Sequence, residues 1–598
     1  MKNDCDKQEE LLHNGSLEKD RILLLGMCQV DILARSFPSQ YKIDHILWES
    51  STWSDFPKFN AGEYSAVIVA PTLRHIMTSV DSPLHGVGTN DILWPRLVFS
   101  NKIEEYFEAC SALVAKKVNH FAEDSKTTPL IFLSFFEPRQ NYIGHLFPRY
   151  SLDNPSYFVM KLNEQIELNV RMQTNSYFLD VNEILNAHGR RSIQDDYVNH
   201  LTHASYLIDS FVVKDGDAER TQKSRLPSEI YDAEESVHNL SQDICFRILD
   251  MLAIIRQQNQ IKLIIVDLDD TLWRGIAAEE ESPHLDMTEG WPLAFAEALL
   301  VFKARGGMLA ICSKNDEAII QSKFDMIMCH RMTFNDFVAV KINYDQKSVN
   351  IKQILSEVNI LPANTLFIDD NPREIAEVLA ELPDIQTLSA DHYDWRRRIL
   401  LATDTQVPRV SVESAHRTES VQASIQRARA KTSFSREEWL HSLALRQTHV
   451  VVESTSHANF QRTFELINKT NQFNTTGRRW THVEASEFFD NGGLFLCASL
   501  QDKMVDNGLI GVAVILGERI EQMVLSCRVF GLGAEQAMTS VATAMILENH
   551  DHAVGVFHDT GRNFTCHDHF TKMGFSAVNG VFVTSVPIPY PTFITAAS

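Results

Sequence analysis

The stretch KLIIVDLDDTL, residues 262–272, decides the fold of this chain. Residues 263–266 form an unbroken apolar run, which predicts a parallel strand buried on both faces. Acids follow at Asp267, Asp269 and Asp270, where open α/β sheets place their ligands. Because side chains alternate along a strand, Asp267 and Asp269 fall on one side. Acids so close repel each other, which predicts a shared proton or a cation, and Mg²⁺ suits carboxylate oxygens.

Two further apolar runs end in polar residues. MLAICSKN (308–315) carries Ser313, and TLFIDDNP (365–372) carries the Asp369–Asp370 pair. A hydroxyl and the N–H groups after it can hold a phosphate oxygen. Lys347, between the two runs, can neutralise phosphate charge. Helical stretches alternate with these strands, so we expect a doubly wound sheet with its chemistry at the carboxyl edge.

In order and spacing, these features resemble the four motifs of the haloacid dehalogenase (HAD) superfamily. They are Asp-x-Asp-x-Thr at 267–271, Ser313, Lys347 and the Asp369–Asp370 pair. The resemblance implies that Asp267 is the nucleophile that accepts a phosphoryl group. It implies that Asp269 is the general acid and base. The alternative, an acidic strand end that binds only a structural ion, does not account for four motifs in the right order.

The resemblance also assigns ligands around these two residues. It implies phosphate binding by Thr271, Ser313, Lys314 and Lys347. It implies Mg²⁺ binding by Asp267, Asp269 (through its backbone carbonyl), Asp369 and Asp370. Phosphoryl transfer requires mainly positioning and charge neutralisation, which such a set can supply.

Size and charge limit the other possibilities. The 598 residues predict about three or four domains, and 44% hydrophobic residues support buried cores. A net charge of −23 argues against nucleic acid and against anionic membranes as partners. Nine scattered cysteines without a Cys-x-x-Cys pair predict neither a disulfide framework nor a zinc site. No signal sequence or membrane-length apolar run is evident, so we expect a soluble cytoplasmic protein.

Residues 1–255 are expected to form a separate α/β domain. Strands are predicted at 21–26, 66–70, 129–134 and 177–180. The arrangement resembles the SGNH hydrolase fold, in which a Ser follows the first strand and a His comes late. Cys28 stands at the position of that Ser, and His200 and His203 come near the end. A Cys–His pair can be nucleophilic. We favour the alternative of a degenerate domain that has lost catalysis.

The HAD-like domain is expected at 256–410, with only a small cap between Trp273 and Trp291. Residues 411–445 are predicted to be a helical linker, within a basic stretch that begins at Asp391. We interpret that stretch as a solvated helix rather than a docking face for an acidic partner.

Residues 446–598 are predicted to form an α+β domain. The runs 505–515 and 520–527 read as adjacent antiparallel strands. Arg528, Gly531 and Gly533 then open a helix, whose free N–H groups suit a pyrophosphate. This pattern resembles the coenzyme A loop of GNAT acyltransferases, although Phe570 stands where that family often has Tyr. A packed domain without acyl-CoA chemistry is the alternative.

In combination, the HAD-like and GNAT-like parts resemble the FkbH-like proteins (HAD subfamily IIIC). That resemblance implies transfer of a glyceryl unit from 1,3-bisphosphoglycerate to the phosphopantetheine arm of an acyl carrier protein, for polyketide-type biosynthesis. A thiolate would carry the acyl group between them. Cys312, beside Ser313, and Cys527, beside the expected pantetheine groove, are the candidates. Strand alternation turns Cys312 away from the Ser313 face.

Two other functions remain open from the sequence. One is a Mg²⁺-dependent phosphatase of a small phosphorylated metabolite, with inert flanking domains. The other is a non-catalytic scaffold that recruits a carrier protein, which the complete motif set disfavours.

Overall fold

The computed structural model describes most of the chain, in segments. They are residues 20–26, 29–47, 59–73, 76, 101–125, 128–139, 141, 143–194, 233–280, 284–389, 391–410, 417–419, 421–423, 436–470, 472–503, 505–561, 563–578 and 580–597. The chain divides into two compact units, Met1–Ile255 and Arg256–Ser598. No helix among the described residues is long and apolar enough to cross a membrane.

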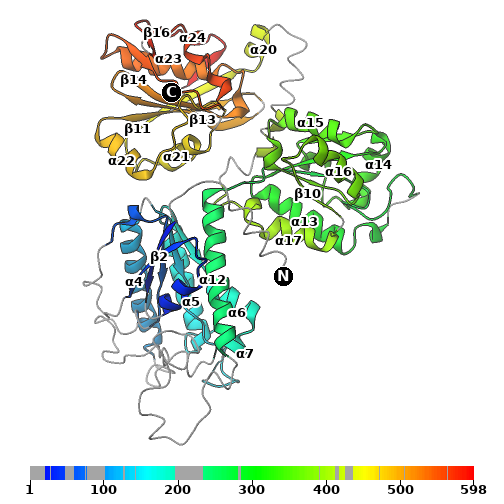
Figure 1. Ribbon diagram of the computed structural model, residues 1–598, viewed down its shortest axis with the longest axis vertical. Coiled ribbons are helices and arrows are strands. Elements are labelled where there is room, and N and C mark those ends of the chain that lie inside the picture. The colour runs from blue at the N-terminus through cyan, green and yellow to red at the C-terminus, as the bar shows by residue number, and fades with distance from the viewer. Residues whose placement is uncertain are drawn as a thin grey trace, which may run out of the picture. The chain divides into compact units, whose positions relative to one another are not determined.

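The first unit is built on a five-stranded parallel sheet of order β2-β1-β3-β4-β5 (Figure 1). Its strands are β1 (Arg21–Gly26), β2 (Lys42–Leu47), β3 (Ala66–Ala70), β4 (Leu130–Leu133) and β5 (Ser176–Leu179). Its helices are α2 (Gln29–Ser36), α4 (Ile103–Asp124), α5 (Pro155–Arg171), α6 (Val181–His188), α7 (Arg190–Ile193) and α12 (Ala233–Arg256).

Alternation along β1 explains how helices cover both faces of this sheet. Leu23 and Leu25 pack against α4 and α5, whereas Ile22 and Leu24 pack with α2, α6 and α12. The strands predicted from apolar runs are confirmed at β1, β3, β4 and β5, within a residue at each end. The sequence did not reveal β2, because this edge strand mixes polar and apolar residues and none of its residues is buried.

A second parallel sheet, of order β10-β9-β6-β7-β8, lies in the middle of the chain. Its strands are β6 (Leu263–Val266), β7 (Met308–Ser313), β8 (Ala339–Ile342), β9 (Thr365–Ile368) and β10 (Gln386–Leu388). Its helices are α13 (Trp291–Ala304), α14 (Glu317–Ile327), α15 (Lys347–Val358), α16 (Pro372–Glu381) and α17 (His392–Leu401). The central strand β6 has β7 and β9 as its neighbours, so the polar residues that follow these three strands meet at one edge.

Burial on both faces is complete around β6. Ile264 and Val266 lie in a core with α13, α14 and α17, and Leu263 and Ile265 lie in a second core with α15 and α16. Trp395 of α17 is 1% exposed, so this helix, which falls in the stretch predicted to be solvated, is part of the packed domain.

The C-terminal part is a mixed eight-stranded sheet of order β16-β17-β15-β14-β13-β12-β11-β18 (Figure 1). Its strands are β11 (Leu445–Val452), β12 (Leu494–Gln501), β13 (Asp506–Leu516), β14 (Arg519–Leu525), β15 (Ala553–Gly555), β16 (Ser576–Val578), β17 (Val581–Thr584) and β18 (Ile594–Ala597). Its helices are α20 (Arg436–Ser442), α21 (Phe460–Lys469), α22 (His482–Asp490), α23 (Ala534–Leu547) and α24 (His569–Lys572).

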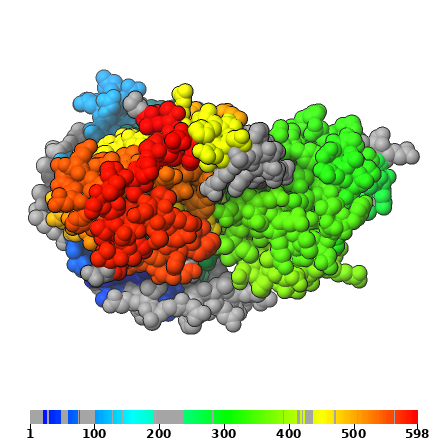
Figure 2. All heavy atoms as spheres, turned by 90° about the horizontal axis from the view of Figure 1, so that it is seen from above, coloured from blue at the N-terminus to red at the C-terminus, as the bar shows by residue number. Residues whose placement is uncertain are grey.

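The described residues also form short 3-10 turns: η2 (Ala61–Glu63), η3 (Leu285–Met287), η4 (Phe334–Asp336), η5 (Pro362–Asn364), η6 (Thr403–Thr405), η8 (Cys527–Val529) and η9 (Phe564–Cys566). The predicted antiparallel pair is confirmed as β13 and β14. Figure 2 shows the last residues of the chain, orange to red, gathered into one continuous surface.

Candidate functional site

Three carboxylates meet at the carboxyl edge of the middle sheet. Asp267 follows β6, and Asp369 and Asp370 follow β9. One oxygen from each lies within 4.8 Å of the others. Asp267 is 7% exposed and Asp369 is 0% exposed, so little water screens their repulsion. Such a cluster requires a positive partner.

Lys347, the first residue of α15, is that partner within the chain. Its Nζ lies 3.1 Å from Asp267 Oδ2 and 2.6 Å from Asp369 Oδ2. Burial by itself would lower the pKa of Lys347, but Asp267 and Asp369 outweigh it and raise that pKa. The ammonium therefore stays charged and holds the strand ends after β6 and β9 together.

For the acids Asp369 and Asp370, the surroundings favour the neutral form rather than the charged one. Burial, and then the charge of Asp267, raise the pKa of Asp369 to about 6, although Lys347 opposes the shift. Burial also raises the pKa of Asp370. Thr271 Oγ1 donates to Asp370 Oδ1 at 3.3 Å and accepts from the Asp370 amide at 3.1 Å. The structure thus places Thr271, which was predicted to bind phosphate, against a carboxylate that it orients.

The cluster fits a divalent cation. Three carboxylates and one ammonium leave a formal charge of −2. Asp267 Oδ1 is buried and has no hydrogen-bond partner among the described residues, which is costly for an anionic oxygen. Mg²⁺ prefers carboxylate oxygens and is commonly held by one or two of them with substrate phosphate and water. Asp267, Asp369 and Asp370 are the residues that would hold it.

The end of β7 lies beside the end of β6 and carries two of the predicted phosphate ligands, Ser313 and Lys314. Val266 pairs with Ile311, so Ser313 ends a strand directly beside β6. Ser313 is 2% exposed, and its hydroxyl makes no hydrogen bond within the described part of the chain. Lys314 was also predicted to bind phosphate, and in the structure its Nζ donates to Glu374 Oε1 of α16 at 2.6 Å. Its charge is therefore already paired outside the carboxylate cluster.

Asp269 does not join the carboxylate cluster through its side chain. Its two oxygens accept hydrogen bonds from Trp273, Ala277 and Asn315. The sequence did not reveal these contacts, although both side chains carry donor groups and lie near predicted site residues. Trp273 comes four residues after Asp269, and Asn315 comes two residues after Ser313. Glu374 was also missed, since nothing in the sequence pairs it with Lys314.

Cys312 is poorly placed to carry an acyl group. It is 0% exposed and packs in the core beneath α15 and α16, on the sheet face that strand alternation predicts. Its Sγ donates to the Lys347 carbonyl at 3.8 Å. Burial raises the pKa of this thiol, whereas a nucleophilic cysteine requires a low one. The expected acyl-carrying role of Cys312 is at odds with this environment, and the Cys527 side chain lies outside the described residues.

The predicted coenzyme A loop has the expected backbone. Gly531 and Gly533 have φ values of 79° and 78°, and Gly533 caps α23 in the left-handed conformation. Arg528, however, is turned into its own domain, where it donates to Ser526 Oγ at 3.1 Å and to the Leu509 carbonyl at 3.4 Å. Phe570, at the position expected for Tyr, is 2% exposed and packs in the domain core.

The sheet edge next to this loop is occupied by the chain itself. β14 pairs with β15 only at Arg519 and Ile520. Farther along, the Thr475 amide donates to the Met523 carbonyl at 3.0 Å, and the Leu525 amide donates to the Phe473 carbonyl at 3.1 Å. The His558 amide also donates to the Thr475 carbonyl, at 2.7 Å. The segment Phe473–Thr475 therefore fills the opening between β14 and the chain that follows β15.

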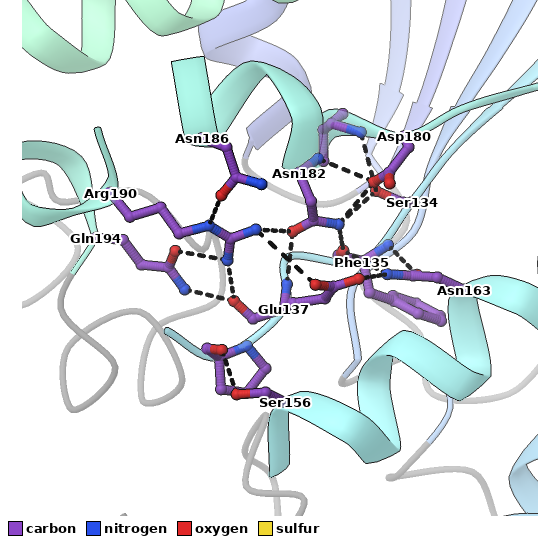
Figure 3. Close-up of polar contacts among 12 residues, drawn as sticks. Ser134, Phe135, Glu137, Ser156, Asn163, Asp180, Asn182, Asn186, Arg190 and Gln194 are labelled. Carbon is purple, nitrogen blue, oxygen red and sulfur yellow. Dashed lines mark hydrogen bonds and ion pairs between the residues drawn. The ribbon is translucent and has the colours of Figure 1, made fainter. Parts of the chain in front are cut away.

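The N-terminal sheet has polar side chains at its carboxyl edge, after β4 and β5 (Figure 3). Ser134 Oγ donates to Asp180 Oδ1 at 2.9 Å and accepts from Asn182 Nδ2 at 3.0 Å. Arg190 donates to the Glu137 carbonyl at 2.7 Å and to Asn182 Oδ1 at 3.0 Å. These groups bond to one another and fix the loop after β4, which indicates a structural role.

The N-terminal residues with predicted chemistry, Cys28, His200 and His203, lie outside the described residues. The order 2-1-3-4-5 of the parallel sheet is that of a doubly wound α/β fold.

The fold and site thus define an α/β protein with two parallel sheets, a mixed C-terminal sheet and a carboxylate–lysine cluster suited to Mg²⁺. Comparisons with family models and with curated proteins found no match. One solved structure that the chain resembles is the crystal structure of the N-terminal part of the protein BF1531 from Bacteroides fragilis, containing a phosphatase domain complexed with Mg. The identity is 19% over 66% of this chain and 96% of that chain, with a TM-score of 0.45. A resemblance this distant assigns no function to the chain.

Proposed function

We propose that the middle domain is a Mg²⁺-dependent phosphoryl-transfer domain that hydrolyses a phosphorylated small molecule, with Asp267 as the nucleophile. The observation that carries this proposal is the buried Oδ1 of Asp267, which has no hydrogen-bond partner in the part of the chain that the structure describes and lies in a cluster with Lys347, Asp369 and Asp370. A purely structural ion pair would not require a third carboxylate, the partly buried Asp370, beside the two buried ones.

Each residue then has a defined task. An oxygen of Asp267 forms a bond to phosphorus, the bond to the leaving oxygen breaks, and water later cleaves the aspartyl phosphate. The Lys347 ammonium and the Ser313 hydroxyl hold the phosphoryl oxygens. Bound Mg²⁺ supplies charge neutralisation at the phosphate. Thr271 keeps Asp370 turned toward the cluster.

Phosphate release from a panel of phosphate esters and acyl phosphates tests this function on the full-length chain. We expect release that requires Mg²⁺ and stops when a chelator removes it. Absence of release from every compound, with Mg²⁺ present and the protein folded, would refute the proposal.

Glyceryl transfer is the finer activity that we propose, with an acyl carrier protein as the partner and 1,3-bisphosphoglycerate as the donor. The motif resemblance to FkbH-like proteins supports it. Intact-protein mass spectrometry after incubation of enzyme, Mg²⁺, donor and holo carrier tests it, because loading adds a glyceryl mass to the carrier. If phosphate is released from the donor while the carrier mass never changes, hydrolysis is the whole activity.

A further inference from the structure

The side chain of Asp269 is fixed by three donors that come from two different places. The Trp273 indole N–H and the Ala277 amide donate to Oδ1 at 2.9 Å and 3.0 Å. The Asn315 side-chain amide donates to Oδ2 at 2.7 Å. Trp273 and Ala277 belong to the loop after β6, whereas Asn315 follows β7.

These donors are themselves held rigidly. Trp273 is 0% exposed and packs edge-on against Phe324, with ring centroids 5.8 Å apart. Asn315 is 4% exposed, two residues beyond Ser313 at the end of β7. A functional side chain that is held by buried, packed neighbours keeps one orientation without ordering during the reaction.

The number of donors differs between the two oxygens. A carboxylate oxygen has about two lone-pair sites. Two donors occupy Oδ1, whereas Oδ2 receives only Asn315 within the described residues, so one site on Oδ2 stays available. Oδ2 is therefore the oxygen of Asp269 that can bond to a further group.

We propose that Trp273 and Asn315 are positioning residues that orient Asp269, so that Oδ2 is the atom which transfers the proton. This inference rests on the proposed function. As Asp267 bonds to phosphorus, the electron pair of the broken bond stays on the leaving oxygen, which takes the proton from Oδ2. In the second half, Oδ2 takes a proton from the attacking water, and the electron pair of the Asp267–phosphorus bond returns to Asp267.

Leaving groups of different basicity separate this role from a merely structural one. 4-Nitrophenolate leaves with little help from a proton, whereas the alkoxide of glycerol 3-phosphate needs one. Trp273→Phe keeps the ring and removes the N–H, and Asn315→Leu keeps the approximate shape and removes the donor. We expect each variant to lose about tenfold or more in kcat on glycerol 3-phosphate, which is part of the roughly 10²–10⁴-fold that acid–base catalysis contributes. The loss on 4-nitrophenyl phosphate should be less than about threefold, with KM unchanged on both.

A matched control is available in the same core. Trp395 is 1% exposed and donates its indole N–H to the Ser389 carbonyl at 2.9 Å. Trp395→Phe should affect both esters equally. The shift in Tm caused by Mg²⁺ is a second readout, and it should match the parent in Trp273→Phe and Asn315→Leu, because neither residue belongs to the carboxylate cluster.

The outcomes separate the two proposals. If the parent hydrolyses both esters and Trp273→Phe and Asn315→Leu lose equally on both, the positioning role is wrong and the proposed function stands. The same holds if Trp395→Phe shows the same discrimination between esters. If the parent hydrolyses neither ester nor any other phosphate compound, both proposals fall together.

Discussion

Replacing Asp267 by asparagine separates catalysis from stability in this protein. The substitution keeps the size of the side chain and removes one buried negative charge. An amide is a poor nucleophile, so we expect phosphate release to fall by at least about a thousandfold, since the covalent route is lost.

The effect on stability can be worked from the distances. At an effective dielectric constant near 20, relief of repulsion with each neighbouring carboxylate, at no more than 4.8 Å, stabilises the variant by roughly 3.5 kcal/mol or more. Loss of the contact with Lys347 at 3.1 Å costs roughly 5 kcal/mol. The free energy of unfolding of the metal-free variant should therefore exceed that of the parent by about 2 kcal/mol.

Two measurements check this prediction. Phosphate release gives the activity, and thermal unfolding with and without Mg²⁺ gives the stability. Asp270→Asn is the matched control, because Asp270 lies in the same loop at a φ of 50° that Asn tolerates, and its Oδ1 accepts the Gly275 amide at 2.8 Å, as an Asn carbonyl can. The control should keep activity within about threefold. Asp267→Asn releasing phosphate at the parental rate would refute the nucleophile assignment, and with it the proposed mechanism.

Three other changes test the same cluster. Lys347→Met leaves the buried charges of Asp267 and Asp369 without their shared cation and should destabilise the metal-free protein by about 3 kcal/mol; unaltered denaturant unfolding would contradict this ion pairing. Because the pKa of Asp369 is raised to about 6 in the folded state, metal-free stability should fall as pH rises from about 4 to about 6 and then level off. Mg²⁺ competes with that proton, so its shift in Tm should be larger at pH 7.5 than at pH 5; equal shifts would argue against Asp369 as a ligand. Cys312→Ala should keep phosphate release within about threefold, because the thiol lies in the apolar core, and loss of carrier loading alone would restore its acyl-carrying role.

The sequence predicted the parts of the site that strand periodicity controls. Apolar runs that end in Asp267, Ser313 and Asp369 could be placed on parallel strands, and parallel strands bring their carboxyl ends to one edge. Lys347 lies on a helix, whose position the strand pattern does not fix. It could therefore be added to the site only from the order of the motifs.

Contacts between side chains of different loops could not be predicted in this way. The pairing of Lys314 with Glu374, and of Asn315 with Asp269, depends on loop conformations that have no periodic signal in the sequence. The same reason explains why Thr271 was assigned to phosphate rather than to Asp370. Alternation did predict the side of the sheet on which Cys312 lies.

The segment Phe473–Thr475 has a consequence for any ligand that would add to the edge of β14. A tethered segment competes as if it were present at millimolar effective concentration, whatever the amount of protein. A free thioester would have to exceed that level, or bind much more tightly than the segment, to replace it. The segment therefore already occupies the hydrogen-bonding groups at this edge of β14. We expect soluble coenzyme A to leave the hydrogen exchange of the Met523 and Leu525 amides unchanged.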